Sequence, residues 1–318
     1  MPANHRLSVE FRGHTLALEN VPCDFCGGTE FVPFWSKMRH GLDLETVFCA
    51  ACSLCQTNPR PTPDANRLFY QRLYMSFHGN SSNLDSEYVT RSARIAAPRV
   101  DLLARVIGKD QPLTVFEVGA GAGQFQRLAR ERTSWRVSGI EPGKEQAELC
   151  RRLCLDVENR FLEEAPGDGG PYDVVVSFHV FEHFLSPADF LRRVNRLLKP
   201  GGLLYLEVPN LASPGGPFTA FLQFPHLYSF TAITLRNYLT AIGGFQPVFT
   251  SEGRSDLGMM SRKISEARTD HPRAGDFERY DLERFREKMK VLERVFTLAS
   301  YVPRLPVLEK VRATLFSV

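Results

Sequence analysis

Short apolar runs alternate with amphipathic segments through the middle of the chain. Five such runs each lead into a turn or a helical pattern: 113–118, 135–140, 155–157, 172–178 and 203–208. A buried run followed by apolar positions at helical spacing is typical of parallel strands joined by helices. Two later runs, 246–251 and 257–264, predict an antiparallel hairpin that closes the sheet. The pattern therefore predicts an α/β fold around a seven-stranded sheet.

The first of these strands ends in clustered glycines. Residues 113–118 turn through Gly119, Gly121 and Gly123 into a helix that begins near Gln124. Glycine lets the backbone bend sharply and lets a ligand approach the main chain. The free N–H groups of the following helix then face that ligand. The dinucleotide fingerprint G-x-G-x-x-G/A is not matched, because Gln124 stands at its last position.

An acidic residue, Glu117, stands two positions before the first glycine, which gives E-x-G-x-G-x-G. This pattern resembles motif I of class I S-adenosylmethionine (SAM) dependent methyltransferases, which have a Rossmann-like sheet. In that family the acid and the loop backbone hold the amino-acid end of SAM. The alternative is a glycine-rich turn of another α/β protein. The resemblance implies cofactor contacts from five positions: Glu117, Gly119, Ala120, Gly121 and Gly123.

Three further segments carry expected SAM contacts. Glu141 ends the second predicted strand and is followed by Pro142. A carboxylate at this position accepts hydrogen bonds from both ribose hydroxyls in dinucleotide and SAM folds. Phe161 and Leu162 follow the third strand, in a loop that should pass near the adenine. The family often has a small or acidic residue where Phe161 stands.

Histidines follow the fourth strand and precede the last crossover helix. His179-Val-Phe-Glu-His183 resembles the H-V-L-E-H motif of small-molecule methyltransferases, and its glutamate is misplaced for the zinc motif H-E-x-x-H. The segment 224–231 resembles a motif of sugar and quinone methyltransferases that lies near the acceptor. An imidazole titrates near neutrality and can act as a general base. We therefore expect the catalytic group among four residues, each with a packing role as its alternative: His179, His183, His226 and Tyr228. His179 is expected to face SAM.

Cysteines form two C-x2-C pairs near the N-terminus. Each pair places two thiolates on one tight turn, and two pairs supply the tetrahedral sulfur set that zinc prefers. Cys55 leaves an ambiguity, because it stands three residues after Cys52. The stretch to Asn58-Pro59-Arg60-Pro61 resembles the zinc module of bacterial sugar C-methyltransferase-like proteins, with Ser53 where that family usually has glycine. The resemblance implies one structural zinc ion with four ligands: Cys23, Cys26, Cys49 and Cys52.

Composition and charge change this picture little. The chain has 318 residues, 43% hydrophobic residues and a net charge of +3, which is too mild to indicate nucleic-acid binding. No apolar run reaches the roughly 18 residues of a membrane span, and the N-terminus does not match a signal peptide, so a cytoplasmic location is expected. We predict four parts: a zinc-binding module (1–63), a helical lid (64–108), a SAM-binding domain (109–265) and a C-terminal helical extension (266–318). From the lid, Tyr70, Tyr74 or His78 could reach the site.

The motifs together predict a SAM-dependent methyltransferase with a small-molecule acceptor. The zinc-module resemblance implies a sugar, often nucleotide-linked, in polysaccharide or natural-product assembly. Three alternatives stay open: O- or N-methylation of a non-sugar metabolite, RNA methylation through the zinc knuckles, and a non-catalytic SAM-binding scaffold. Acidic residues offset the basic ones between Cys23 and Cys55, which disfavours RNA. The C-terminal extension is expected to cap the domain or to form a homodimer or docking contact.

Overall fold

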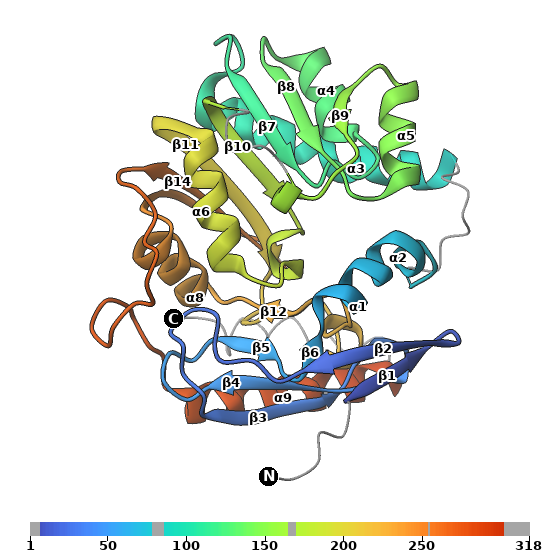
Figure 1. The fold of residues 1–318 in the computed structure, drawn as a ribbon, viewed down its shortest axis with the longest axis vertical. Helices are drawn as coiled ribbons and strands as arrows, with labels where there is room; N and C mark the ends of the chain where they lie inside the picture. Colours follow the sequence, from blue (N-terminus) through green and yellow to red (C-terminus); the bar gives the residue numbers. More distant parts are fainter. Residues whose placement is uncertain (1–6, 78–85, 165–169, 254, 302–318) are drawn as a thin grey trace.

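The structure, a computed structural model, describes residues 7–77, 86–164, 170–253 and 255–301. A large α/β body lies above two smaller sheets, and short helices lie between them (Figure 1). Within these residues no helix is both long and apolar enough to cross a membrane. The predictions for His78, the loop around it and the segment after Tyr301 fall outside the described residues.

The large sheet has seven strands. Their order across the sheet is β13 (Phe245–Glu252), β14 (Asp256–Lys263), β11 (Leu198–Pro209), β10 (Tyr172–Phe178), β7 (Thr114–Val118), β8 (Arg136–Ile140) and β9 (Asp156–Glu158). β14 runs antiparallel to both of its neighbours, while β11, β10, β7, β8 and β9 are mutually parallel. The predicted α/β fold with a seven-stranded Rossmann-like sheet is confirmed.

Helices cover both faces of this sheet, because successive strand residues point to opposite sides. Val115 of β7 packs with Val100 and Phe125, which belong to α3 (Ser86–Leu103) and α4 (Gln124–Arg132). Its neighbour Phe116 packs on the other face with Leu191 of α6 (Pro187–Leu197). The remaining α-helices are α1 (Pro63–Leu68), α2 (Tyr74–Phe77), α5 (Lys144–Arg152), α7 (Phe218–Phe221), α8 (Ala232–Asn237) and α9 (Leu282–Tyr301). Single turns of other helix types are η1 (Arg39–Gly41), η2 (Phe69–Leu73), η3 (Ala104–Gly108), η4 (Leu162–Glu164), η5 (Phe181–His183) and η6 (Tyr238–Ile242).

The N-terminal region forms two small sheets. One consists of β1 (Ser8–Phe11), β2 (His14–Glu19) and β6 (Arg60–Pro61), and the other of β12 (Tyr228–Ser229), β5 (Cys55–Thr57), β4 (Asp43–Cys49) and β3 (Phe31–Lys37). The hairpin expected between Cys26 and Cys49 is therefore β3–β4. β12 comes from the expected acceptor segment, and it pairs Tyr228 with Gln56 and Ser229 with Cys55. The N-terminal module thus includes a short strand from a segment that is remote in the sequence.

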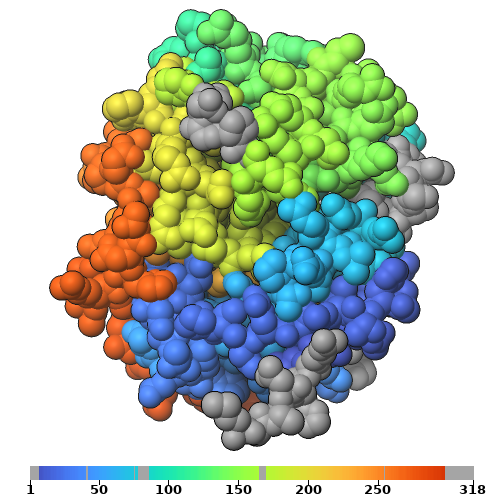
Figure 2. Space-filling model, viewed as in Figure 1, coloured from blue at the N-terminus to red at the C-terminus, as the bar shows by residue number. Residues whose placement is uncertain are grey.

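Module and large sheet share one hydrophobic core. Phe25, from the first cysteine turn, is buried and packs 5.0 Å from the ring of Tyr238 in η6. Figure 2 shows the N-terminal region, in blue, in continuous contact with the light-blue helices and with the lower edge of the large domain. The four predicted parts therefore pack as one body, and their boundaries stay a prediction.

The C-terminal helix α9 packs on the N-terminal sheets. Met289 and Leu292 are buried in a cluster that includes Leu44 of β4. The helix begins at Leu282, where the side chain of Asp281 accepts a hydrogen bond from the backbone N–H of Arg284 and caps the first turn. The described part of the C-terminal extension thus caps the N-terminal module through α9.

Candidate functional site

A cavity of about 610 Å³ lies at the carboxyl ends of β7, β8 and β10, beneath helices from the lid. On the sheet side its walls include Gly119, Gly121, Glu141, Pro142, Phe161, Leu162 and His179. The helices contribute Tyr70, Tyr74, Tyr88 and Arg99. Seven of the predicted cofactor positions thus meet in one cavity. Tyr88 and Arg99 were not singled out in the sequence, because nothing local marks a helical residue that faces a remote sheet.

The glycine loop leaves open space at one position. A Cβ at Gly121 would meet no atom within 4 Å, and this residue lines the cavity. A Cβ at Gly119 would lie 2.4 Å from Cγ2 of Val180, so a side chain there would displace the next loop. Ala120 and Gly123 are not among the cavity-lining residues: Ala120 donates to the carbonyl of Ile140, and Gly123 precedes α4.

Two buried carboxylates flank this loop. Burial raises the pKa of Glu117 to about 8, although the charge of Arg99 opposes the shift, and its Oε2 atom has no hydrogen-bond partner. Glu141 is held rigidly, because its two oxygens accept hydrogen bonds of 2.7 Å from the backbone N–H groups of Gly121 and Gly143. Glu117 thus offers a buried acceptor without a donor, whereas Glu141 offers its remaining lone pairs at the cavity wall.

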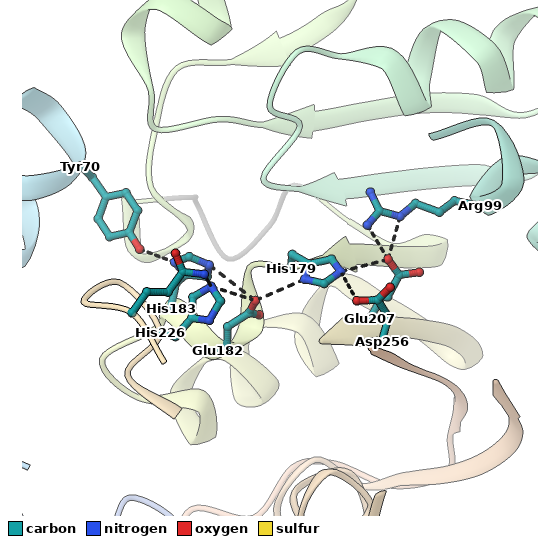
Figure 3. Close-up of polar contacts among 9 residues, drawn as sticks. Tyr70, Arg99, His179, Glu182, His183, Glu207, His226 and Asp256 are labelled. Atoms are coloured by element: carbon teal, nitrogen blue, oxygen red, sulfur yellow. Dashed lines mark hydrogen bonds and ion pairs between the residues drawn. The ribbon is translucent and has the colours of Figure 1, made fainter. Parts of the chain in front are cut away.

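A chain of close polar contacts links the lid to the loop after β10 (Figure 3). The hydroxyl of Tyr70 lies 2.6 Å from Nδ1 of His183, and Nε2 of His183 lies 3.5 Å from Oε1 of the buried Glu182. Burial raises the pKa of Tyr70 well above its ordinary value, so the hydroxyl keeps its proton and donates a hydrogen bond to Nδ1. Nε2 on the other side of the ring faces Glu182. This is the arrangement of a base oriented by a carboxylate.

His179 lies on the opposite side of Glu182. Its Nδ1 is 3.7 Å from Glu182 Oε1, and its Nε2 is 3.3 Å from Glu207 Oε1 and 3.4 Å from Asp256 Oδ1. Burial lowers the pKa of His179, but the three carboxylates outweigh it and hold the pKa well above the ordinary value. The raised pKa favours the protonated ring, in which both nitrogens carry a hydrogen and face carboxylates. His179 also lines the cavity.

His226 and Tyr228 lie behind the cavity wall rather than in it, since neither lines the cavity. The hydroxyl of Tyr228 donates to the carbonyl of Leu185 at 3.0 Å and lies 3.3 Å from Nη1 of Arg60. Nε2 of His226 is 3.9 Å from Glu182 Oε1 and 3.1 Å from the amide nitrogen of Gln223. Both predicted residues support the loop with His183, and the sequence did not show which side of the loop they face.

Donor atoms of Glu182, His183 and His226 lie within 4.8 Å of one another and could in principle hold a metal ion. The contacts around His226 argue for a cluster of polar side chains instead. Arg39 donates to the oxygen of the Gln223 amide at 3.4 Å, which turns its NH2 group toward Nε2 of His226. The lone pair that would bind a metal therefore already accepts a hydrogen bond.

The four predicted zinc ligands converge in the N-terminal module. Sγ of Cys23 lies 3.5 Å from Sγ of Cys52, and Sγ of Cys26 lies 3.6 Å from Sγ of Cys49. A Cβ at Gly28 would lie 3.3 Å from Sγ of Cys49, so this glycine leaves room for the cluster. Four converging thiols suit one tetrahedral ion with no open position.

Cys55 lies outside the cysteine cluster. It is fully buried on β5 with Phe48 and Leu211, and burial raises the pKa of its thiol. The two cysteine turns are followed by residues with the same left-handed backbone conformation. Gly27 follows the first turn with φ +72°, and Ser53 follows the second with φ +64°. Ser53 thus occupies a left-handed position that glycine favours, which explains glycine in the related modules.

A family model for a methyltransferase domain matches residues 88–246, half of the chain. The chain belongs to this methyltransferase family. It is 32% identical over 105 residues to a ubiquinone biosynthesis O-methyltransferase of Methylocella silvestris (31% of this chain, 40% of the relative). It is 31% identical over 137 residues to the enzyme of that name from Caulobacter vibrioides (39% and 54%). The matches thus span about half the length of these relatives.

The methyltransferase fold is also found among solved structures. The 1,6-didemethyltoxoflavin-N1-methyltransferase of Burkholderia thailandensis, solved with 1,6-didemethyltoxoflavin and S-adenosylhomocysteine, superposes with a TM-score of 0.51. At 22% identity the superposition covers 68% of this chain and 97% of that protein, and it shows the shared fold. The domain is therefore a class I SAM-dependent methyltransferase domain.

The residues of this methyltransferase domain suit SAM. Glu117 is not among the cavity-lining residues, but its Oε2 atom is a buried acceptor without a hydrogen-bond partner, to which an ammonium group could donate. Gly121 opens the loop to the cavity, and Glu141 presents a fixed carboxylate to hydroxyl groups. Phe161 lines the cavity, and the guanidinium of Arg67 lies 4.9 Å from the centre of its ring. The family resemblance implied cofactor contacts at Glu117, Gly121 and Glu141, whereas nothing in the sequence indicated the contact of Arg67.

Proposed function

We propose that this methyltransferase moves a methyl group from SAM to a hydroxyl group of a small-molecule acceptor, with His183 as general base. One observation carries the proposal: the Tyr70–His183–Glu182 chain, in which Tyr70 and His183 line the cavity. A hydroxyl must lose its proton to become a good nucleophile, so a base beside the cavity suits this acceptor. A neutral amine already has a free lone pair and therefore has less need of a base.

SAM supplies an electrophilic methyl group when it is bound. Glu117 would hold its ammonium group, the 119–123 loop its carboxylate end, and Glu141 its ribose hydroxyls. These contacts orient the donor against the acceptor, and positioning accounts for much of such a rate enhancement. His179, as a fixed cation, would donate a hydrogen bond rather than remove a proton.

In this proposal the acceptor oxygen would take the methyl group, S-adenosylhomocysteine would leave, and the hydroxyl proton would move to Nδ1 of His183. Tyr70 already donates to that nitrogen, so the proton either passes through the Tyr70 hydroxyl or arrives after the acceptor displaces it. The resulting imidazolium lies beside the buried carboxylate of Glu182, which stabilises its charge.

A sugar, most often linked to a nucleotide, is the acceptor class we propose. The cavity wall beyond the SAM loop offers Tyr74, Tyr88, Arg99 and Asp256, which suit a polyhydroxylated ligand with charged groups. The resemblance of the cysteine module to those of sugar C-methyltransferase-like proteins supports the same class. Methylation at an acidic sugar carbon would use the same base.

O-methylation of a non-sugar ring hydroxyl is the second candidate. It is favoured by the similarity to ubiquinone biosynthesis O-methyltransferases, although that similarity covers only part of each chain. RNA methylation ranks lowest among the alternatives, because acidic residues offset the basic ones along the cysteine module. We propose a structural zinc ion in the cysteine cluster.

Incubation of the protein with SAM and panels of nucleotide-sugars, hydroxylated aromatics and RNA, followed by detection of S-adenosylhomocysteine, tests the function. We expect turnover with a nucleotide-sugar and none with RNA. Calorimetry with SAM tests the site: Gly121→Arg should abolish binding and Glu141→Ala should weaken it. Unchanged binding in both variants would contradict the assigned SAM site. Glu145→Ala, an exposed change on α5 next to the same loop, serves as the control.

A further inference from the structure

We infer that Asp24 and Arg60 of the N-terminal module are positioning residues that fix the loop carrying His183. The inference rests on the proposed function only in that it gives His183 its role as base. The module would then set the geometry of the methyl-transfer site, in addition to holding a metal ion.

Asp24 lies inside the first cysteine turn, between Cys23 and Cys26, yet its side chain contacts the methyltransferase domain. One carboxylate oxygen, Oδ2, accepts hydrogen bonds from the backbone N–H of Ala188 at 3.0 Å and from the hydroxyl of Tyr238 at 3.1 Å. Ala188 is in the first turn of α6, where backbone N–H groups lack partners within the helix. Asp24 therefore caps a helix that is remote in sequence.

Arg60 holds the same segment three residues earlier. Its Nη1 atom donates to the carbonyl of Leu185 and lies 3.3 Å from the hydroxyl of Tyr228, which donates to that same carbonyl at 3.0 Å. Glu19 of β2 fixes the other side of the guanidinium at 3.2 Å. Two side chains thus converge on one backbone oxygen of the loop.

These anchors are close enough to His183 to determine where its ring lies. Leu185, whose carbonyl Arg60 holds, lines the cavity two residues after His183. Ala188 follows three residues later. Side-chain hydrogen bonds therefore hold the segment between His183 and α6 at Leu185 and again at Ala188. A base displaced by about 1 Å can lose on the order of 100-fold in rate. Hydrogen bonds at Leu185 and Ala188 therefore bear directly on the geometry of His183.

The chemistry of the anchors indicates orientation rather than simple packing. An apolar side chain could fill the space of Asp24 without the cost of removing a carboxylate from water. A carboxylate and a guanidinium instead make directional bonds to backbone groups. Because Asp24 shares its turn with two of the clustered cysteines, the arrangement of the thiols also sets the position of the Ala188 contact.

Amide exchange and histidine NMR test the inference without an acceptor. In Asp24→Leu we expect the Ala188 amide to exchange at least about tenfold faster and the His183 ring resonance to move, because the carboxylate acceptor is lost. S-adenosylhomocysteine, the probe for the cofactor pocket, should bind within twofold of wild type. Asp24→Asn keeps an oxygen acceptor and should restore both signals. The exposed Asp43→Leu on β4 is the matched control and should change neither.

Arg60→Met and Arg60→Lys give a second pair should Asp24→Leu fail to fold. Methionine should shift the His183 resonance, and lysine, which keeps a cationic donor, should restore it in part. An unmoved His183 resonance in a folded Asp24→Leu or Arg60→Met protein overturns the inference. Full turnover by His183→Ala would overturn the proposed base instead, and would leave the exchange of Ala188 as the measure of positioning.

Discussion

The hydroxyl of Tyr70 lies 2.6 Å from Nδ1 of His183, although one residue belongs to the helical lid and the other to the loop after β10. The contact joins the lid to the expected proton acceptor and continues through Nε2 of His183 to the buried Glu182. Figure 3 shows that Glu182 then separates His183 from His179. The two histidines, four residues apart, thus differ in their surroundings: one ring lies between a hydroxyl donor and a carboxylate, and the other lies among three carboxylates.

Replacement of His183 should remove the base. His183→Ala should lower kcat by about 10²- to 10⁴-fold, the range that general-base catalysis usually contributes. Tyr70→Phe should cost less, since Nδ1 stays available to the acceptor. Initial rates of S-adenosylhomocysteine release with the acceptor from the turnover panel measure both effects. His226→Ala is the comparison variant, and a larger loss there than in His183→Ala would reassign the base.

Binding of the cofactor should release a proton from Glu117. The pKa of about 8 means that this carboxyl is largely protonated at pH 7 in the free protein, whereas an ammonium group favours the carboxylate. Affinity for S-adenosylhomocysteine should therefore rise between pH 6 and 8, by up to about tenfold per pH unit. Calorimetry in buffers of different ionisation enthalpy counts the released protons. Glu117→Gln should bind weakly and release none.

His179 should remain charged at neutral pH. Asp256, Glu182 and Glu207 together hold its pKa above the ordinary value, so Asp256→Asn should lower that pKa. The ion pairs of His179 contribute stability that is fully present below the ordinary imidazole pKa and is lost as pH rises through the folded-state pKa. NMR titration of ¹³C-labelled histidine between pH 6 and 9 reports the shift. A ring that titrates near pH 6.5 in the wild type would refute the assignment.

The variants Cys52→Ser and Cys55→Ser should differ in zinc content. Cys52→Ser removes a thiol of the converging cluster and should lose the metal, whereas Cys55→Ser changes a buried residue outside it and should keep one zinc per chain. Mass spectrometry of the purified variants gives the metal content. Loss of zinc from both variants would contradict the ligand set.

Ser53→Gly should stabilise the protein. Ser53 adopts φ +64°, a conformation that costs a residue with a Cβ atom about 1 kcal/mol relative to glycine. The substitution should raise the melting temperature by about 2 °C, with a small loss from the long 3.5 Å contact of its hydroxyl with the carbonyl of Tyr280. Thermal unfolding measures the change. The reverse substitution at the matching turn, Gly27→Ser, should lower the melting temperature.

The sequence by itself determined the large sheet and its cofactor loop. Periodic apolar runs set the seven strands. Gly119 and Gly121 follow one strand and Glu141 follows the next, so their positions in the chain already mark the cavity. The two C-x2-C pairs likewise predicted the cysteine cluster, because each turn brings two thiols together within four residues.

Only the tertiary structure decided the surroundings of the polar residues beside the cavity. His179, His183 and His226 have the same chemistry in the sequence, and they differ because each meets different neighbours from remote segments. The pairing of β12 with β5 and the reach of Asp24 to α6 likewise join parts that are far apart along the chain. A residue's pKa and orientation depend on such contacts, which local spacing does not specify.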